Sequence, residues 1–251
     1  MISLNRLFGR SPTTQATAAK APNLAEPLFI IGDIHGCLEQ LESLLDTIWK
    51  KDGFDARIIT VGDMIDRGPH SAQVLQKLVA LQRVSGARLT CLKGNHEQMM
   101  LDFLAKPSEN GLRWIQSGGI NTLESFNISL QGQLTSLEDL ADQLRARMGA
   151  ELLNWLQRLP TFWTEGNVGV VHAAADPALS LEEQKEDTLL WGHNDFRKQE
   201  RPDGMWIIHG HTIVKEPRIR AGRISVDTGA YKGHPLSAAV IKNGTIDFLQ
   251  T

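Results

Sequence analysis

GDMIDRG, at residues 62–68, decides the fold, because it places two aspartates and an arginine directly after a β-favouring run at residues 57–61. Three related stretches are GDIHG at residues 32–36, GNHE at residues 94–97 and HGHT at residues 209–212. The first two also follow apolar runs, at residues 28–31 and 88–92. A buried run that stops at glycine predicts a strand that enters a tight turn. The ends of parallel strands meet at one edge of a sheet, so we expect these polar residues to share one crevice.

Two helical patterns separate these runs. Apolar residues recur at helical spacing over residues 38–48 and again over residues 72–81, and Gly86 ends the second helix. Strand and helix therefore alternate in this part of the chain. Alternation of this kind predicts a parallel sheet with helices on its faces, joined by right-handed crossovers.

A helical insert is predicted at about residues 108–160. Apolar residues have helical spacing at residues 137–148 and again at 152–159. Such an insert would either overhang the crevice as a cap or pack against the edge of the sheet.

The last third of the chain contains five short β-favouring runs separated by turns, and Asn243-Gly244 predicts a hairpin. The runs lie at residues 168–171, 206–208, 224–226, 238–241 and 245–248. They predict a second, mainly antiparallel sheet packed on the first. The expected fold class is therefore α/β, a two-sheet β-sandwich flanked by helices with a helical insert.

The N-terminal residues 1–27 are expected to form a flexible tail, and residues 28–251 a single domain. Residues 11–27 are rich in Thr, Ala, Gln and Pro and lack periodic apolar residues. The first ten residues contain apolar and basic side chains, which suit either a frayed end or a segment that docks on a membrane or a partner.

The composition excludes several classes of protein. The chain has 251 residues, 41% of them hydrophobic, and a net charge of −3, which argues against binding to nucleic acid. It has neither a membrane-spanning apolar run nor a secretory signal, so stable membrane insertion is not expected. Its two cysteines, Cys37 and Cys91, are predicted to be reduced thiols, which indicates a cytoplasmic protein. Neither cysteine suits a cysteine-dependent phosphatase, because Ser43 and Glu97 stand where the required arginine would be.

Metal-ligand residues follow most of the predicted strands. A single histidine at a strand end usually has a structural role, and Asn-His before a helix is usually a capping pair. Here, however, several such residues coincide: Asp33, His35, Asp63, Asn95, His96, His172 and His211. Carboxylate, amide and imidazole ligands suit Mn²⁺ or Fe better than structural zinc. Two such ions can clamp an in-line displacement at phosphorus, so the predicted reaction is phosphoester hydrolysis.

The motifs, in this order, resemble the PPP family of metallophosphatases, particularly its short bacterial and phage branch. Further matches are Trp114, Gly118-Gly119, Leu189-Leu190-Trp191 and Asp227-Thr228-Gly229. The resemblance extends from about Phe29 to the C-terminus and implies a calcineurin-like metallophosphoesterase fold.

The resemblance also implies a role for each site residue. The implied first-metal ligands are Asp33 and His35, the bridging ligand is Asp63, and the second-metal ligands are Asn95, His172 and His211. His96 is the implied general acid, Asp66 the carboxylate that orients it, and Arg67 the phosphate clamp, with Asn95 as a further phosphate contact. The family attacks phosphorus directly with a metal-bridging hydroxide. Two divalent ions are therefore the expected cofactors, with Mn²⁺ first and Fe or Zn as alternatives.

One position departs from the family pattern. The branch usually carries a second phosphate-binding arginine two residues after the tryptophan of Leu-Leu-Trp, and this chain has His193 there. We expect Arg197, with or without His193, to replace it if residues 192–197 are helical, because Arg197 then lies one turn further on.

The expected activity is that of a metal-dependent phosphoprotein phosphatase acting on phosphoserine and phosphothreonine, with a phosphoprotein or phosphopeptide as partner. Related chains hydrolyse dinucleoside polyphosphates or other small phosphoesters, and the shared motifs leave this alternative open. A non-catalytic metal-binding scaffold is the alternative from another class. The sequence leaves the oligomeric state open.

Overall fold

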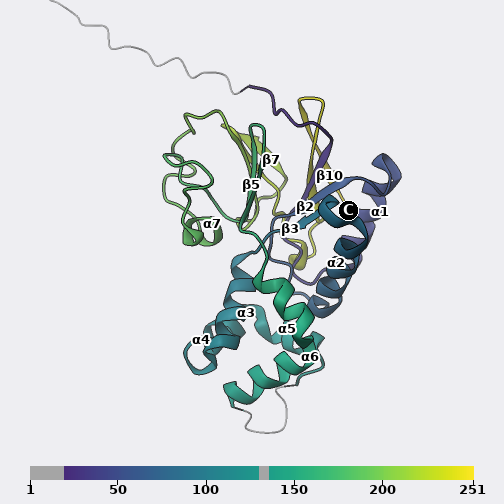
Figure 1. Cartoon of the computed structure of the whole chain (residues 1–251), viewed down its shortest axis with the longest axis vertical. Coiled ribbons are helices and arrows are strands. Elements are labelled where there is room, and N and C mark those ends of the chain that lie inside the picture. Colours follow the sequence, from purple (N-terminus) through teal and green to yellow (C-terminus); the bar gives the residue numbers. More distant parts are fainter. Residues whose placement is uncertain (1–19, 130–135) are drawn as a thin grey trace, which may run out of the picture.

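Two five-stranded sheets pack face to face in the computed structural model, which describes residues 20–129 and 136–251 (Figure 1). The first sheet has the strand order β10-β9-β1-β2-β3. Its strands are β1 (Leu28–Ile31), β2 (Arg57–Thr60), β3 (Leu89–Cys91), β9 (Ser237–Lys242) and β10 (Thr245–Gln250). Strands β1, β2 and β3 are parallel, whereas β9 and β10 form an antiparallel hairpin that joins the sheet beside β1.

The second sheet has the order β4-β5-β6-β8-β7. Its strands are β4 (Phe162–Glu165), β5 (Val168–Val171), β6 (Trp206–His209), β7 (Arg218–Arg220) and β8 (Arg223–Ser225). The central pairs β5/β6 and β6/β8 are parallel, and the two edge pairs are antiparallel. Apolar side chains from both sheets, such as Ile30, Ile59, Val170 and Ile224, fill the space between them.

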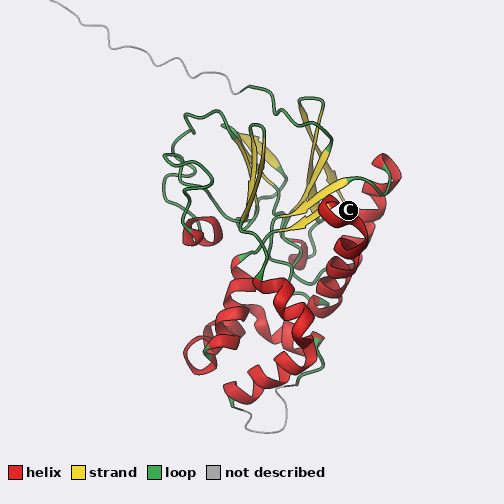
Figure 2. Cartoon of the chain, viewed as in Figure 1, coloured by secondary structure: helices red, strands yellow, loops and turns green. Residues whose placement is uncertain are grey.

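Helices cover the outer face of the first sheet and extend beyond one end of the sandwich (Figure 2). The α-helices are α1 (Leu38–Asp52), α2 (Ser71–Ser85), α3 (Asn95–Ala105), α4 (Pro107–Trp114), α5 (Ile120–Ser125), α6 (Leu137–Gln157) and α7 (Glu186–Trp191). Three short helical segments are η1 (Gly86–Arg88), η2 (Ile115–Gly119) and η3 (Ala230–Lys232). The leucines of α1 share one apolar cluster with Phe29 and Ile31 of β1. Helix α3 packs on α4 and α6, α4 packs on α6, and both α5 and α6 pack on α2. The backbone of α6 kinks at Gly149, between the two apolar patterns expected over residues 137–148 and 152–159.

The expected fold class is confirmed, but the composition of the two sheets differs from the prediction. The runs at residues 238–241 and 245–248 do form a hairpin, yet they lie in the first sheet and not in the second. The second sheet is consequently mixed, and its core pairs are parallel. The prediction was wrong because a short alternating run does not reveal which sheet provides its partner.

Residues near the N-terminus contact the second sheet. Trp206 donates its indole N–H to the carbonyl of Lys20 at 2.7 Å, and the side chain of Asn167 bonds the backbone of Ala21 and Asn23. These contacts involve the last residues of the predicted tail, at positions 20–23. Residues 1–19 lie outside the described residues, so the flexibility of the tail stays a prediction. No helix within residues 20–129 and 136–251 is both long and apolar enough to cross a membrane.

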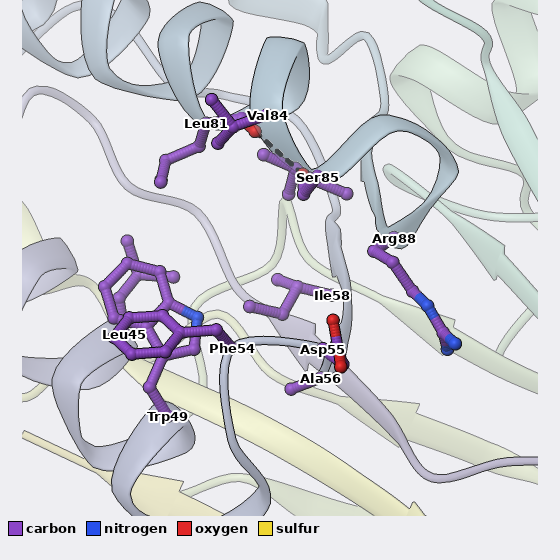
Figure 3. Close-up of a pocket in the computed structure, with 11 residues that line it drawn as sticks. Leu45, Trp49, Phe54, Asp55, Ala56, Ile58, Leu81, Val84, Ser85 and Arg88 are labelled. Carbon is purple, nitrogen blue, oxygen red and sulfur yellow. Dashed lines mark hydrogen bonds between the residues drawn. The ribbon is translucent and has the colours of Figure 1, made fainter.

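One apolar cavity lies far from the predicted crevice. Trp49, Phe54, Leu81 and Val84 line it, and its volume is about 240 Å³ (Figure 3). It opens beside Ala56, just before β2, and therefore at the amino end of the strand. Ligands of open α/β sheets bind beyond the carboxyl ends of the strands, so this cavity is not the crevice that the motifs predict.

Gly62 brings the turns after β2 and β3 into contact. Its φ of +100° is costly for residues with a side chain, and a Cβ there would lie 2.5 Å from the backbone nitrogen of Gly94. Asp63 and Asn95 follow these two glycines, so the close approach sets the spacing of two predicted ligands.

Replacing Gly62 with alanine should destabilise the chain more than the same change at Gly53. Gly53 also has a positive φ, but no atom lies within 4 Å of its added Cβ, so Gly53→Ala measures backbone strain alone, about 1–3 kcal/mol. The clash at Gly62 should add about 1–3 kcal/mol. Urea unfolding of both variants checks this, and equal losses would contradict the close-approach argument.

Candidate metal centre

The predicted site residues lie after the carboxyl ends of five strands, three from the first sheet and two from the second. They are Asp33 and His35 after β1, Asp63 after β2, Asn95 and His96 after β3, His172 after β5 and His211 after β6. Because all five ends point in one direction and the two sheets are stacked, residues up to 178 positions apart come together.

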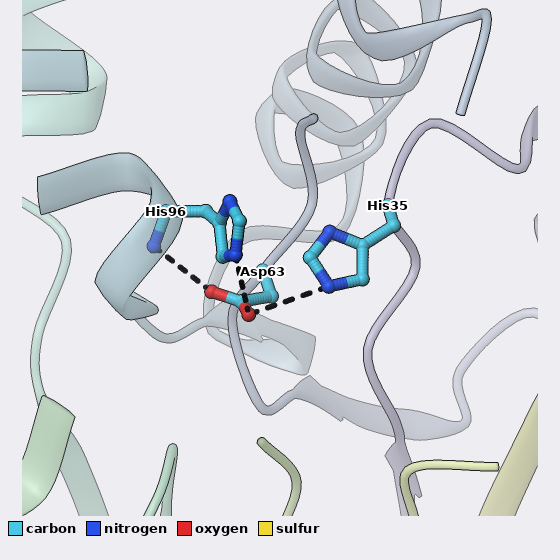
Figure 4. Close-up of side chains that lie close together, drawn as sticks. All are labelled: His35, Asp63 and His96. Carbon is cyan, nitrogen blue, oxygen red and sulfur yellow. Dashed lines mark hydrogen bonds and ion pairs between the residues drawn. The ribbon is translucent and has the colours of Figure 1, made fainter. Parts of the chain in front are cut away.

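Asp63 stands at the centre of the site. Its Oδ2 lies 3.4 Å from Nε2 of His35 and 3.9 Å from Nε2 of His96 (Figure 4). Its Oδ1 lies 3.4 Å from Nε2 of His172. Burial opposes the negative charge of Asp63, but the three histidines outweigh it and hold its pKa far below the usual range. A carboxylate with ligand atoms on both sides suits the predicted bridging role.

A second set of donor atoms converges on the amide of Asn95. Its Oδ1 lies 2.8 Å from Nε2 of His172 and 2.9 Å from Nδ1 of His211. His209 does not belong to this set, because its ring contacts the carbonyl of Gly210 and the hydroxyl of Ser225. The structure thus brings His211, rather than His209, to the other predicted ligands.

The histidine tautomers fit metal ions. His35 donates from Nδ1 to the carbonyl of Ile65 at 2.7 Å, and His172 donates from Nδ1 to the carbonyl of Val61 at 3.0 Å. Burial lowers the pKa of His35 to about 3 and that of His172 to about 4, so both rings are neutral. Their Nε2 atoms therefore present lone pairs to the centre, and the backbone carbonyls fix this orientation.

Two groups of donor atoms lie close enough to hold two ions. The atoms within each group lie within 4.8 Å of one another, and the groups are His35, Asp63 and His96, and Asp63, His172 and His211. Beside the second group, Nε2 of His172 and Oδ1 of Asn95 face each other with lone pairs, an arrangement that a cation stabilises. The second group therefore fits a divalent ion. Nε2 of His35 beside the other oxygen of Asp63 offers donors for a second ion that would share Asp63, and His96 is left free to carry its proton.

Asp33 is buried beside the centre, with both carboxylate oxygens accepting the backbone N–H of His211 at 3.1 and 3.0 Å. Burial, with the nearby charges of Asp227 and Asp63, raises the pKa of Asp33 well above its usual value. Asp33 does not belong to either convergent group, so its role as a ligand of the first metal stays a prediction. Asp227, which the sequence marked only as part of a family match, is a further buried carboxyl whose pKa burial raises to about 6. Such a concentration of buried acids favours a bound cation.

His96 and Asp66 form a hydrogen-bonded pair at 2.7 Å, between Nδ1 and Oδ2. Burial opposes protonation of His96, but the charge of Asp63 and the bond to Asp66 outweigh it and raise its pKa. The ring therefore keeps its proton to a higher pH than free imidazole does. With Nε2 directed toward Asp63, His96 is placed to give a proton to a group bound at the centre.

The predicted insert fixes the position of Asp66. Trp114 donates its indole N–H to Oδ2 at 3.0 Å, and Thr122 donates its hydroxyl to Oδ1 at 2.6 Å. The backbone N–H of Asp66 is bonded by the hydroxyls of Ser71 and Thr122. These contacts hold the carboxylate although its backbone has a φ of +71°. The insert was expected either to cap the crevice or to pack against the edge of the sheet. The contacts with Asp66 show a further role, which is to hold the carboxylate that bonds His96.

Arg67 faces the same centre. Its guanidinium lies 3.0 Å from Nε2 of His35 and 4.8 Å from the ring centroid of Tyr231, and its backbone N–H donates to the carbonyl of Gly118. The position agrees with the expected phosphate clamp. Tyr231 packs on this arginine.

The expected replacement for the missing arginine is only partly supported by geometry. Residues 192–197 form turns and not a helix, because Gly192, with a φ of +111°, ends α7. Arg197 nevertheless lines, with His193 and His211, a cavity of about 560 Å³, and it donates to the hydroxyl of Thr212. Nε2 of His193 lies 3.6 Å from a carboxylate oxygen of Asp176, which directs the ring toward that acid.

The sequence assigned no role to Glu97, although it belongs to the quoted GNHE motif. This buried carboxylate accepts four backbone N–H groups, from Asp63, Met64, Ile65 and Gly94, at 2.8–3.2 Å. Glutamate three residues into a helix that follows a glycine N-cap is a recognisable capping signal. Here the same side chain also bonds the turn after β2, a contact that the local pattern does not reveal.

Replacing Glu97 with glutamine should lower the free energy of unfolding by about 1–3 kcal/mol, because the amide cannot accept at all four N–H groups. It should also weaken Mn²⁺ binding, since the backbone that positions Asp63 loses its support. Thermal unfolding and calorimetric Mn²⁺ titration measure the two effects. Glu124→Gln, which changes an exposed glutamate, is the control and should alter neither.

Comparison with known proteins agrees with this geometry. The chain is 30% identical to serine/threonine-protein phosphatase 1 of Salmonella typhimurium, over 86% of this chain and 92% of that one. It is 26% identical to the asymmetrical bis(5'-nucleosyl)-tetraphosphatase PrpE of Halalkalibacterium halodurans, over 83% and 87% of the two chains. The crystal structure of a cold-active protein-tyrosine phosphatase from Shewanella has the same fold, with a TM-score of 0.62, 18% identity and coverage of 90% and 80%.

The model of the calcineurin-like phosphoesterase family matches residues 27–215. This match covers most of the chain and includes every predicted metal ligand. The chain therefore belongs to the calcineurin-like phosphoesterase family.

Proposed function

We propose that the chain is a phosphoprotein phosphatase that hydrolyses phosphoserine and phosphothreonine with two divalent ions, of which Mn²⁺ suits the ligand set best. The observation that carries this proposal is the buried pair of His96 and Asp66 beside Asp63. When bound, the two ions activate a water molecule and polarise the phosphate. The chain's own residues supply the remaining steps.

Arg67 binds two oxygens of the substrate phosphate with its planar guanidinium, and Asn95 contacts the same group. Arg197 and His193 line a common cavity with His211 and complete the phosphate clamp from there. His96 gives its proton to the oxygen that leaves, while Asp66 holds the ring in position and stabilises its positive charge. A fixed proton donor is useful chiefly when the leaving group is a strong base, and the alkoxides of serine and threonine are such groups.

Hydrolysis of dinucleoside polyphosphates is the second candidate. The similarity to PrpE, which extends over most of both chains, favours it. In that reaction a phosphate group departs, which is a weaker base than an alkoxide and has less need of His96. A non-catalytic scaffold is a weaker candidate, because a metal site alone does not require the buried pair of His96 and Asp66.

We also infer a cytoplasmic location. Cys37 and Cys91 are free thiols, the second of them buried, and burial raises the pKa of both. Such thiols suit a reducing compartment.

The Mn²⁺-loaded chain should release phosphate from a phosphoserine peptide with a higher kcat/KM than it cleaves diadenosine tetraphosphate. Phosphate release and nucleotide chromatography measure the two activities in one buffer. Rapid nucleotide cleavage with negligible peptide turnover would favour the second candidate, and no turnover of either would favour the scaffold.

His96→Asn should affect phosphoserine more than p-nitrophenyl phosphate. The variant should lose about 10²–10⁴-fold in kcat on the peptide, because the alkoxide then leaves without a proton donor. Nitrophenolate is a weak base, so the loss on p-nitrophenyl phosphate should be smaller. His234→Asn, at an exposed position, is the control. Equal losses on both substrates would argue that His96 is not the proton donor.

A further inference from the structure

Several arginines lie on the outer face of the second sheet, at the edge formed by β7 and β8. In the register of β7 and β8, Arg220 pairs with Arg223 and Arg218 pairs with Ser225. Next to them on β6, Ser225 pairs with His209. Successive side chains of a strand alternate between faces, so these residues share one face, and Ile224 points to the core between the sheets.

These arginines line one small hollow with a fourth arginine from a loop. Arg197 comes from the segment after α7, and with Arg218, Arg220 and Arg223 it borders a cavity of about 40 Å³. We call these four residues the arginine groove. Neither aspartate nor glutamate lines this cavity.

Three of the four arginines are available to a ligand, because Arg197 is also exposed and donates to a neutral hydroxyl, that of Thr212. Arg223 is almost fully buried and donates to the carbonyl of Gln199 at 2.8 Å, so its role is structural. Arg218 and Arg220 are exposed, and neither forms an ion pair with a carboxylate in the described part of the chain. Burial lowers the pKa of Arg223; the negative charge of Glu200 opposes this shift, and the positive charge of Arg220 adds to it. Like charges held this closely favour the binding of an anion.

The arginine groove adjoins the cavity beside the metal centre. Arg197 and Thr212 line both this hollow and the larger cavity of about 560 Å³. The larger cavity is also lined by His211, which is one of the predicted metal ligands, and again by no acidic residue. A substrate whose phosphate lies at the metal centre can therefore extend past Arg197 to the exposed arginines.

We propose that Arg197, Arg218 and Arg220 form a second anion-binding site, which takes a further phosphate or carboxylate of the substrate beside the phosphate that is hydrolysed. The inference rests on the proposed function, because it needs a phosphate bound at the metal centre. The anion is either a further phosphate of a polyphosphate chain or an acidic side chain of a phosphopeptide. In both cases the arginines favour substrates that carry more than one negative group. The bond that is hydrolysed is the same as in the proposed function.

The test compares the wild-type chain with Arg218→Glu/Arg220→Glu on four substrates. These are p-nitrophenyl phosphate, a phosphoserine peptide with neutral neighbours, the same peptide with glutamates beside the phosphoserine, and diadenosine tetraphosphate. The double variant should lose about tenfold or more in kcat/KM on the acidic peptide, the dinucleotide or both, since electrostatic attraction of a charged substrate is reversed. The first two substrates should be unaffected. The substrate that shows the loss identifies the source of the second anion.

Arg147→Glu/Arg158→Glu is the matched control. It reverses the same number of charges at exposed arginines of the helical region that form no ion pair within the described residues, and it should leave all four activities unchanged. Equal activities of the arginine-groove variant and the wild type on every substrate would overturn the inference. An equal loss on all four substrates would also overturn it, because it would indicate a general structural effect.

Failure of the proposed function gives a different result. If the wild-type chain hydrolyses none of the four substrates, the proposed function is wrong. The second anion-binding site is then tested by measuring how tightly anions bind. Calorimetry in excess Mn²⁺ should then give at least about tenfold weaker binding of inorganic tripolyphosphate to the double variant than to the wild type, with similar binding of orthophosphate. Equal tripolyphosphate affinities would overturn the inference.

Discussion

The centre depends on one buried carboxylate, that of Glu97. Its four backbone N–H partners come from the turns after β2 and β3, so one side chain fixes two loops that carry Asp63, Asn95 and His96. A buried charge is stable only when such bonds replace its hydration. Burial and the neighbouring charge of Asp63 raise the pKa of Glu97 to about 7 even so. The geometry of the site therefore depends on the burial of a charged carboxylate, which is itself unfavourable. The sheet behind the two turns holds the N–H groups in place to compensate for this cost.

The helices between α3 and β4 extend this support to the second half of GDMIDRG. Trp114 and Thr122 hold Asp66, and Gly118 lies against the backbone of Arg67. Asp66 and Arg67 have positive φ angles, which are uncommon outside glycine and persist only where surrounding contacts enforce them. The strand ends and Glu97 thus position the predicted metal ligands, whereas the helical region positions Asp66 and Arg67.

The strands and helices near the motifs could be predicted because their signals are local. Runs of β-favouring residues before glycine gave β1, β2 and β3 within about two residues, and apolar spacing with Gly86 gave the end of α2. Two predictions failed where the information was not local. The hairpin of β9 and β10 joined the first sheet, since β1 offered a free edge that no short pattern reveals. Residues 192–197 did not form a helix, because Gly192 adopts a positive φ.

The sequence by itself determined the chemistry of the centre. Which residue types follow which strands is a property of the chain, and carboxylate, amide and imidazole groups at parallel strand ends suit paired divalent ions wherever such strands meet. Only the tertiary structure decided which of these groups converge and what else lies among them. It separated His211 from His209, linked Glu97 to two loops, and aligned Arg197 with the arginines of β7. The physical reason is that these contacts join residues far apart in the chain, and only the packing of the two sheets and the helices sets their distances.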